Sequence, residues 1–110
     1  RPDGTPAPGN PVADTAGALP EIWSWGHRNI QGATLGPDGR LYLFEDGSGG
    51  NNIVGVNSQG ELFRVAENTV GNGSEFAGGC FSHNGRFMFV NMQNPGLTLV
   101  IEGPWRKGQA

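Results

Sequence analysis

The sequence is poor in residues that several protein classes need. It has one cysteine, Cys80, two histidines, and only seven lysines and arginines among 110 residues. One cysteine cannot form a disulfide within the chain, and so few scattered basic residues do not make the positive stripe that nucleic acid requires. The net charge of −3 agrees, so we expect no nucleic acid partner. No apolar run approaches the roughly 20 residues that span a bilayer, and we expect no membrane partner either.

Glycine and proline are abundant instead, with 20 and 8 copies. Each interior glycine costs a helix about 1 kcal/mol and each proline about 3 kcal/mol, so a helix bundle or a coiled coil is excluded. Collagen is excluded because the glycines keep no three-residue period. Compact apolar runs at 41–44 and 87–90 argue against a disordered chain. The composition therefore predicts a turn-rich all-β protein.

An internal repeat indicates how the strands are organised. Residues 35–45 align with residues 81–91 at an offset of 46 residues. Each copy is a strand, an Asp-Gly or Asn-Gly turn and a second strand, and these dipeptides favour tight hairpins. A third hairpin is expected at 53–65. Four short strands in every 40 to 50 residues is the period of a β-propeller blade.

This pattern predicts a β-propeller-like fold of about two four-stranded blades, with a four-hairpin β-sandwich as the alternative. Residues 31–66 would form the first blade, and 75–102 would supply three strands of the second. The fourth strand is either absent or filled by 21–25, where polar and apolar residues alternate. Propellers have about 4 to 8 blades, so we expect the ring to close only by self-assembly or within a longer chain. The expected parts are an extended Pro/Gly-rich leader (1–20), a strand plus the first blade (21–66), the second blade (67–106) and a tail (107–110).

Glu45 and Asp46 are the strongest candidates for metal ligands. They end a predicted strand and enter a Gly/Asn loop, where carboxylate and carbonyl oxygens can converge on a hard cation. The alternative is a solvated turn, because Asp, Gly, Ser and Asn favour turns without any ligand. The spacing does not match the EF-hand loop.

Three other residues, His27, His83 and Cys80, carry side chains that could take part in chemistry. His27 lies beside Arg28 and Asn29 at a strand end, a cluster that suits an anion or a polarised carbonyl, or else satisfies buried backbone groups. His83 falls inside a hairpin turn and is expected to be exposed. Cys80 falls within an apolar strand and is expected to be a small buried hydrophobe.

Residues 33–106 resemble the C-terminal part of PhoX-type alkaline phosphatases. The matching stretches are 43–47, 74–82, 89–96 and 103–105. The resemblance implies a six-bladed, periplasmic or extracellular propeller with calcium and iron on its axis, and Glu45, with Asp46, as ligand. The first functional hypothesis is therefore a fragment of a metal-dependent phosphate-ester hydrolase with a small-molecule substrate. Whether the chain alone is an enzyme stays open at this point.

Residues 1–32 resemble soluble PQQ-dependent aldose sugar dehydrogenases. The matching residues are Asn10-Pro11, 16–18, 20–29 and Gln31-Gly32, with Ile30 where that family usually has proline. Such enzymes are exported, calcium-dependent, six-bladed propellers in which an Arg-Asn pair contacts the quinone. By this resemblance Arg28 and Asn29 would contact PQQ. Part of such a dehydrogenase is the alternative function.

The two resemblances together suggest a mosaic or an engineered propeller fragment. Both families draw the rest of their active sites from other blades. A third hypothesis is therefore a non-catalytic, self-assembling scaffold that at most binds a ligand in its central channel. Three copies of a two-blade chain would supply six blades, so we expect a homotrimer or a piece of a longer chain.

Overall fold

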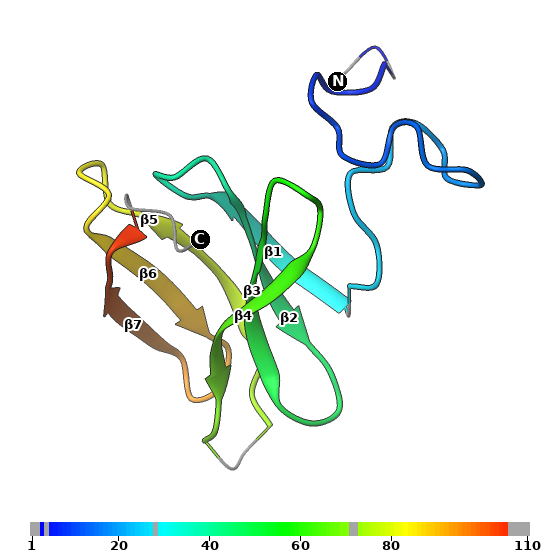
Figure 1. The fold of residues 1–110 in the computed structure, drawn as a ribbon. Coiled ribbons are helices and arrows are strands. Elements are labelled where there is room, and N and C mark those ends of the chain that lie inside the picture. Colours follow the sequence, from blue (N-terminus) through cyan, green and yellow to red (C-terminus); the bar gives the residue numbers. More distant parts are fainter. Residues whose placement is uncertain (1–2, 4, 28, 71–72, 106–110) are drawn as a thin grey trace.

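The computed structural model describes residues 3, 5–27, 29–70 and 73–105, which form two antiparallel sheets and no α-helix (Figure 1). The strands are β1 (Asn29–Leu35), β2 (Leu41–Asp46), β3 (Asn51–Val56), β4 (Leu62–Asn68), β5 (Phe76–Phe81), β6 (Phe87–Met92) and β7 (Leu97–Glu102). The first sheet has the order β1-β2-β3-β4 and the second β5-β6-β7. The expected all-β, propeller-like class is confirmed, and the two blades do not close a ring. In the described part of the chain, no helix is long and apolar enough to cross a membrane.

The second sheet has three strands within the described residues, and the strand predicted at 21–25 is wrong. The side chain of Asn10 contacts this region instead. Its Nδ2 donates to the carbonyl oxygen of Pro20 (2.6 Å), just before the segment, and to that of Ile22 (2.8 Å), within it. The same contacts hold the proline-rich leader against this segment, so the alternation of polar and apolar residues there reflects local packing rather than sheet pairing.

The two sheets pack face to face around a small apolar core. Phe44 and Ile53 of the first sheet and Met88 and Val90 of the second are fully buried. Gly79 makes the close approach possible, because a Cβ there would lie 2.6 Å from Cζ of Phe44 and 2.5 Å from a main-chain oxygen of β6. The core therefore depends on glycine at position 79, which has no side chain, as well as on large apolar side chains.

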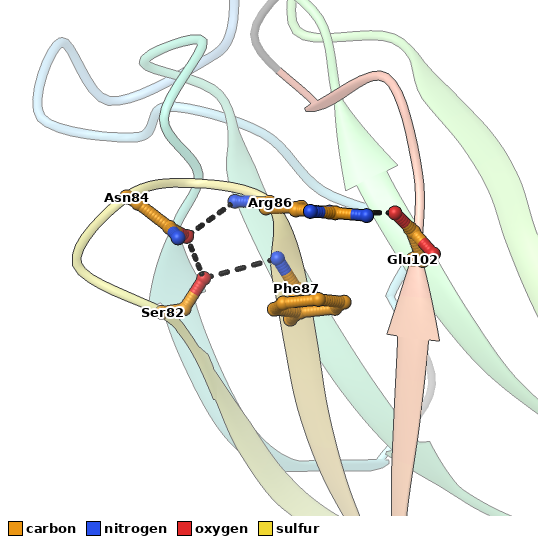
Figure 2. A network of polar contacts seen from close by, with 5 residues as sticks. All are labelled: Ser82, Asn84, Arg86, Phe87 and Glu102. Atoms are coloured by element: carbon orange, nitrogen blue, oxygen red, sulfur yellow. Dashed lines mark hydrogen bonds and ion pairs between the residues drawn. The ribbon is translucent and has the colours of Figure 1, made fainter.

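The repeated hairpins close differently. In the first, the amide of Gly36 donates to the carbonyl of Arg40, whereas in the second the amide of Ser82 donates to Phe87, one residue further along. Figure 2 shows the second turn: the Ser82 hydroxyl accepts from the Phe87 amide (3.0 Å) and donates to Oδ1 of Asn84 (2.8 Å). Glycine has no hydroxyl to make these contacts, so the wider turn follows from the serine.

The wider turn moves the structural repeat from 46 to 47 residues after the hairpin. Leu35 pairs with Leu41, but Phe81 pairs with Met88. The counterpart of Tyr42 is therefore Phe89, which lies on the outer face of the second sheet and is 37% exposed. Cys80 is opposite Phe89 and is also exposed, so the expectation of a buried cysteine is wrong. Strand alternation put Cys80 on the face turned away from the first sheet.

Candidate functional site

Carboxylates and amides gather at one end of the two sheets. There β1 begins, β2 ends, β3 begins, and the chain enters β5. Neighbouring antiparallel strands begin and end at the same edge of a sheet, so these residues come together although they are distant in sequence. We call this set the polar edge; its members are Asn29, Glu45, Asp46, Asn51, Asn52 and Glu75.

Asn29 and Asp46 are directly opposite each other on β1 and β2. Nδ2 of Asn29 donates to Oδ2 of Asp46 over 3.1 Å. Asn29 was expected to contact a quinone and Asp46 a metal, and the structure brings the two together. Arg28, the other residue expected at the quinone, lies outside the described residues.

Glu45 is buried and turns away from Asp46. Successive side chains of a strand point to opposite faces, so the two adjacent carboxylates cannot converge on one ion through a regular strand. Oε2 of Glu45 accepts from Nδ2 of Asn52 on the neighbouring strand (3.1 Å). Oδ1 of Asn52 is buried and has no hydrogen-bond partner within the described residues.

Glu75 approaches Asp46 from the second sheet. Glu75 is half-buried, one residue before β5 begins. Partial burial raises the pKa of Glu75, and the hydrogen bond and negative charge of Asp46 raise it further. The polar edge thus contains a pair of acidic groups that resist carrying two negative charges at once.

Asn51 begins β3 at this edge and is only 1% exposed. Its Nδ2 donates to the carbonyl oxygens of Gly73 (3.1 Å) and Ser74 (3.0 Å), just before Glu75. Its Oδ1 is buried without a hydrogen-bond partner in the part of the chain that the structure describes. A buried amide oxygen without a donor is costly, so it points to an unfilled interaction.

Both histidines of the chain lie within the described residues. His27 pairs with the Ser24 hydroxyl through Nε2 (2.7 Å). His83 is exposed in its turn, as expected. No group of three His, Cys, Asp or Glu side chains that could hold a metal occurs among residues 3, 5–27, 29–70 and 73–105.

A cavity of about 230 Å³ opens at the opposite end of the sheets, away from the polar edge. Tyr42, Phe63 and Trp105 contribute aromatic walls, with Tyr42 edge-on to both other rings. The Tyr42 hydroxyl donates to Oδ2 of Asp38 (3.0 Å). Burial, and then this hydrogen bond, raise the pKa of Tyr42 to about 12.

Comparison with known proteins decides the family. The family of glucose/sorbosone dehydrogenases matches residues 1–78. The chain belongs to this family. An uncharacterized protein of Synechocystis sp. is 38% identical over 62 residues, which cover 56% of this chain and 15% of that protein. No solved structure matches the chain.

The family match crosses residues 32 and 33, where the two resemblances meet. Residues 33–78 therefore fall in the same family as the segment before them. These comparisons support the dehydrogenase resemblance, and they give no support to the PhoX-type phosphatase. The chain spans about 15% of the length of the Synechocystis relative.

Sequence reasoning missed Asn51 and Glu75. In the sequence, Asn51 falls in the Gly/Asn loop after Asp46, and Glu75 is the first residue of the predicted strands at 75–102. Asparagine at a turn gives no sign that it will be buried, and the contact between Glu75 and Asp46 joins two different sheets. The one usable signal was that both residues flank predicted strands at the same edge.

Proposed function

We propose that the chain is part of a PQQ-dependent sugar dehydrogenase and that the polar edge faces the quinone. The family match over residues 1–78 carries this proposal. The position of Asn29 supports it: this residue is exposed at the first position of an edge strand, where a ligand can reach its amide. PQQ, when bound, would supply the chemistry by accepting two electrons from the sugar.

The described residues fit this cofactor in part. Asn29 offers an amide whose Nδ2 is already oriented by Asp46, and such an anchored amide suits a quinone oxygen or a carboxylate. PQQ is itself a polycarboxylate anion, however, and Glu45, Asp46 and Glu75 bring negative charge to the same edge. The fit therefore requires positive charge, which Arg28 or a cation would bring. The role of this chain would be to bind and orient the quinone.

Reconstitution tests the proposal. The protein is mixed with PQQ and calcium, and binding is followed by quenching of tryptophan fluorescence and by cofactor absorbance; glucose-dependent dye reduction is measured separately. We expect Asn29→Ala to weaken quinone binding several-fold. Gln59→Ala is the matched control, because Gln59 is an exposed amide in the turn between β3 and β4, at the other end of the sheet. Quinone binding that is absent, or equal in both variants, would count against the proposal.

A non-catalytic scaffold is a second candidate, favoured by the outer face of the second sheet. Phe89 and Val100 are opposite each other there and are 37% and 56% exposed. Tyr42, the structural counterpart of Phe89, is covered by the second sheet and only 3% exposed. The outer face of the second sheet therefore corresponds to the face of the first sheet that is already buried in this fold. A second copy of the chain would cover it.

Light scattering distinguishes this candidate. A ring of three copies predicts three times the mass of one chain, and Phe89→Asp should reduce that mass to the monomer's. Leu19→Asp is the control, because Leu19 is exposed in the leader (63%). A monomeric wild type would reject the scaffold.

Export to the periplasm or cell surface remains a proposal as well, tested by fractionating cells that express the full-length protein.

A further inference from the structure

We propose that the cavity at the end of the sheets opposite the polar edge binds a small aromatic carboxylate, and that Arg40 holds its carboxylate group. We call this hollow of about 230 Å³ the aromatic cavity, after its walls Tyr42, Phe63 and Trp105. The site is independent of the proposed dehydrogenase function, because the residues assigned to the quinone lie at the other end of the sheets.

Two walls of the aromatic cavity rest on glycines. Phe63 is opposite Gly55 on β3, and its ring occupies the space that a Cβ at Gly55 would need. The indole ring of Trp105 lies against Gly103, where a Cβ would come within 2.9 Å of it. Tyr42 is edge-on to both rings, at interplanar angles of 82° and 88°. Aromatic rings attract a further ring in edge-to-face or offset geometry, so these walls suit a flat apolar ligand.

Arg40 brings a positive charge to the aromatic cavity. Its guanidinium carbon lies 5.6 Å from the centre of the Phe63 ring, and its Nη1 lies 3.7 Å from Oδ2 of Asp38, too far for a hydrogen bond. Asp38 is engaged elsewhere, since Oδ1 accepts from the main-chain amide of Arg40 and Oδ2 from the Tyr42 hydroxyl. The Arg40 side chain is 23% exposed, so a ligand can reach its planar fork of N–H donors.

The other charged side chains that line the aromatic cavity already have partners. Arg64 donates to Glu67 over 3.0 Å, and Glu102 accepts from Arg86 over 2.6 Å. A cationic ligand would therefore have to displace an existing partner of a carboxylate. An anionic ligand would meet Arg40, whose guanidinium makes no side-chain hydrogen bond within the described part of the chain.

The volume of the aromatic cavity limits the size of the ligand. Sites for drug-sized molecules occupy about 300–1,000 Å³, so a cavity of about 230 Å³ suits a smaller molecule. One aromatic ring with one carboxylate would use both features of the site: the ring packs against the walls, and the carboxylate accepts two parallel hydrogen bonds from Arg40. Inorganic phosphate would use only the charge, and an uncharged ring only the walls. Benzoate is the simplest probe that combines both.

Calorimetric titration with benzoate, phosphate and benzyl alcohol tests the site. We expect one benzoate to bind saturably per chain, with phosphate and benzyl alcohol at least tenfold weaker. Tryptophan fluorescence should change as benzoate binds, because Trp105 lines the cavity. The proposal is overturned if benzoate shows no saturable binding. It is also overturned if phosphate or benzyl alcohol binds as tightly as benzoate, since either result would mean that one half of the site is unused.

A matched pair of variants tests the role of Arg40. Arg40→Lys keeps the charge but removes the planar fork, and it should weaken benzoate binding at least fivefold. Arg86→Lys is the control, because Arg86 also lies over a phenylalanine ring, 5.1 Å from the centre of Phe87, but does not line the cavity. This control should bind benzoate as the wild type does, and melting curves check that both variants fold. Equal binding by Arg40→Lys and the wild type, or a loss confined to Arg86→Lys, would overturn the proposal. Benzoate binding without quinone binding would leave this site intact and reject only the dehydrogenase proposal.

Discussion

Nδ2 of Asn29 lies 3.1 Å from Oδ2 of Asp46, and this bond joins two residues that the sequence assigned to different ligands. Asn29 was expected at a quinone and Asp46 at a metal. Their pairing across β1 and β2 makes them parts of one polar edge, to which the second sheet adds Glu75.

A double-mutant cycle measures the Asn29–Asp46 bond. Asn29→Ala and Asp46→Ala should show a coupling of about 0.5–1 kcal/mol in the free energy of unfolding, the usual range for a hydrogen bond near the surface. Urea denaturation of the wild type, both single variants and the double variant gives this number. Strictly additive effects would show that the bond does not form in solution.

Gly79→Ala should be among the most damaging small substitutions. The new methyl group would meet Phe44 and a main-chain oxygen of β6, which cannot rotate away. Overpacking of this kind costs about 1–3 kcal/mol, so the midpoint of urea denaturation should fall clearly. Cys80→Ala, in the same strand but exposed, should have little effect. Equal stability of Gly79→Ala and the wild type would contradict the packing of the two sheets.

Loss of the Ser82 hydroxyl should reduce the stability of the protein more than loss of the ion pair beside it. Ser82→Ala removes the hydroxyl that accepts a hydrogen bond from the Phe87 amide and donates one to Asn84 (Figure 2). This loss should lower the free energy of unfolding by about 1 kcal/mol. The side chains of Arg86 and Glu102 are 63% and 60% exposed, so the loss of stability caused by Glu102→Gln should be smaller and should depend on salt. Thermal melts at low and high salt compare the two variants. A larger loss from Glu102→Gln would reverse this ranking.

Tyr42 is the one tyrosine of the chain, so its ionisation can be read directly from absorbance at 295 nm. The midpoint should lie near pH 12, because burial and Asp38 raise the pKa of Tyr42 from 10.0 to about 12. The folded protein holds this proton more tightly than the unfolded chain. The resulting stability is complete below pH 10 and is lost as the pH rises towards 12. Asp38→Asn should lower the midpoint; a wild-type midpoint near 10 would show that the ring is solvated.

Much of the fold followed from local patterns. Asp-Gly and Asn-Gly turns between short apolar runs predicted the two repeated hairpins, which the structure contains. The structure has no strand at 21–25. Alternation of polar and apolar residues does not by itself provide a neighbouring strand with which to pair. The carbonyl oxygen of Ile22 accepts from Asn10 instead, a contact that no periodicity reveals.

The candidate site was predictable only where it lay next to a recognisable motif. Asn29 and Asp46 stood out through a resemblance and through a loop rich in Gly and Asn. Glu75 and Asn51 did not, because their importance depends on burial and on contacts between sheets. Cys80 shows the same limit: its strand was identified, but the face on which it lies was not.

An all-β chain with paired hairpins follows from local sequence alone, since abundant glycine and proline exclude helices and the turn dipeptides fix where strands reverse. The sequence of residues 1–78 also assigns the chain to its family. Which faces are buried depends on the folded structure, because one extra residue in the second turn reverses every side chain of β6 relative to the sequence repeat. Tertiary structure likewise placed Asp46 beside Glu75, since packing of the sheets brings distant carboxyl groups into contact whatever their separation along the chain.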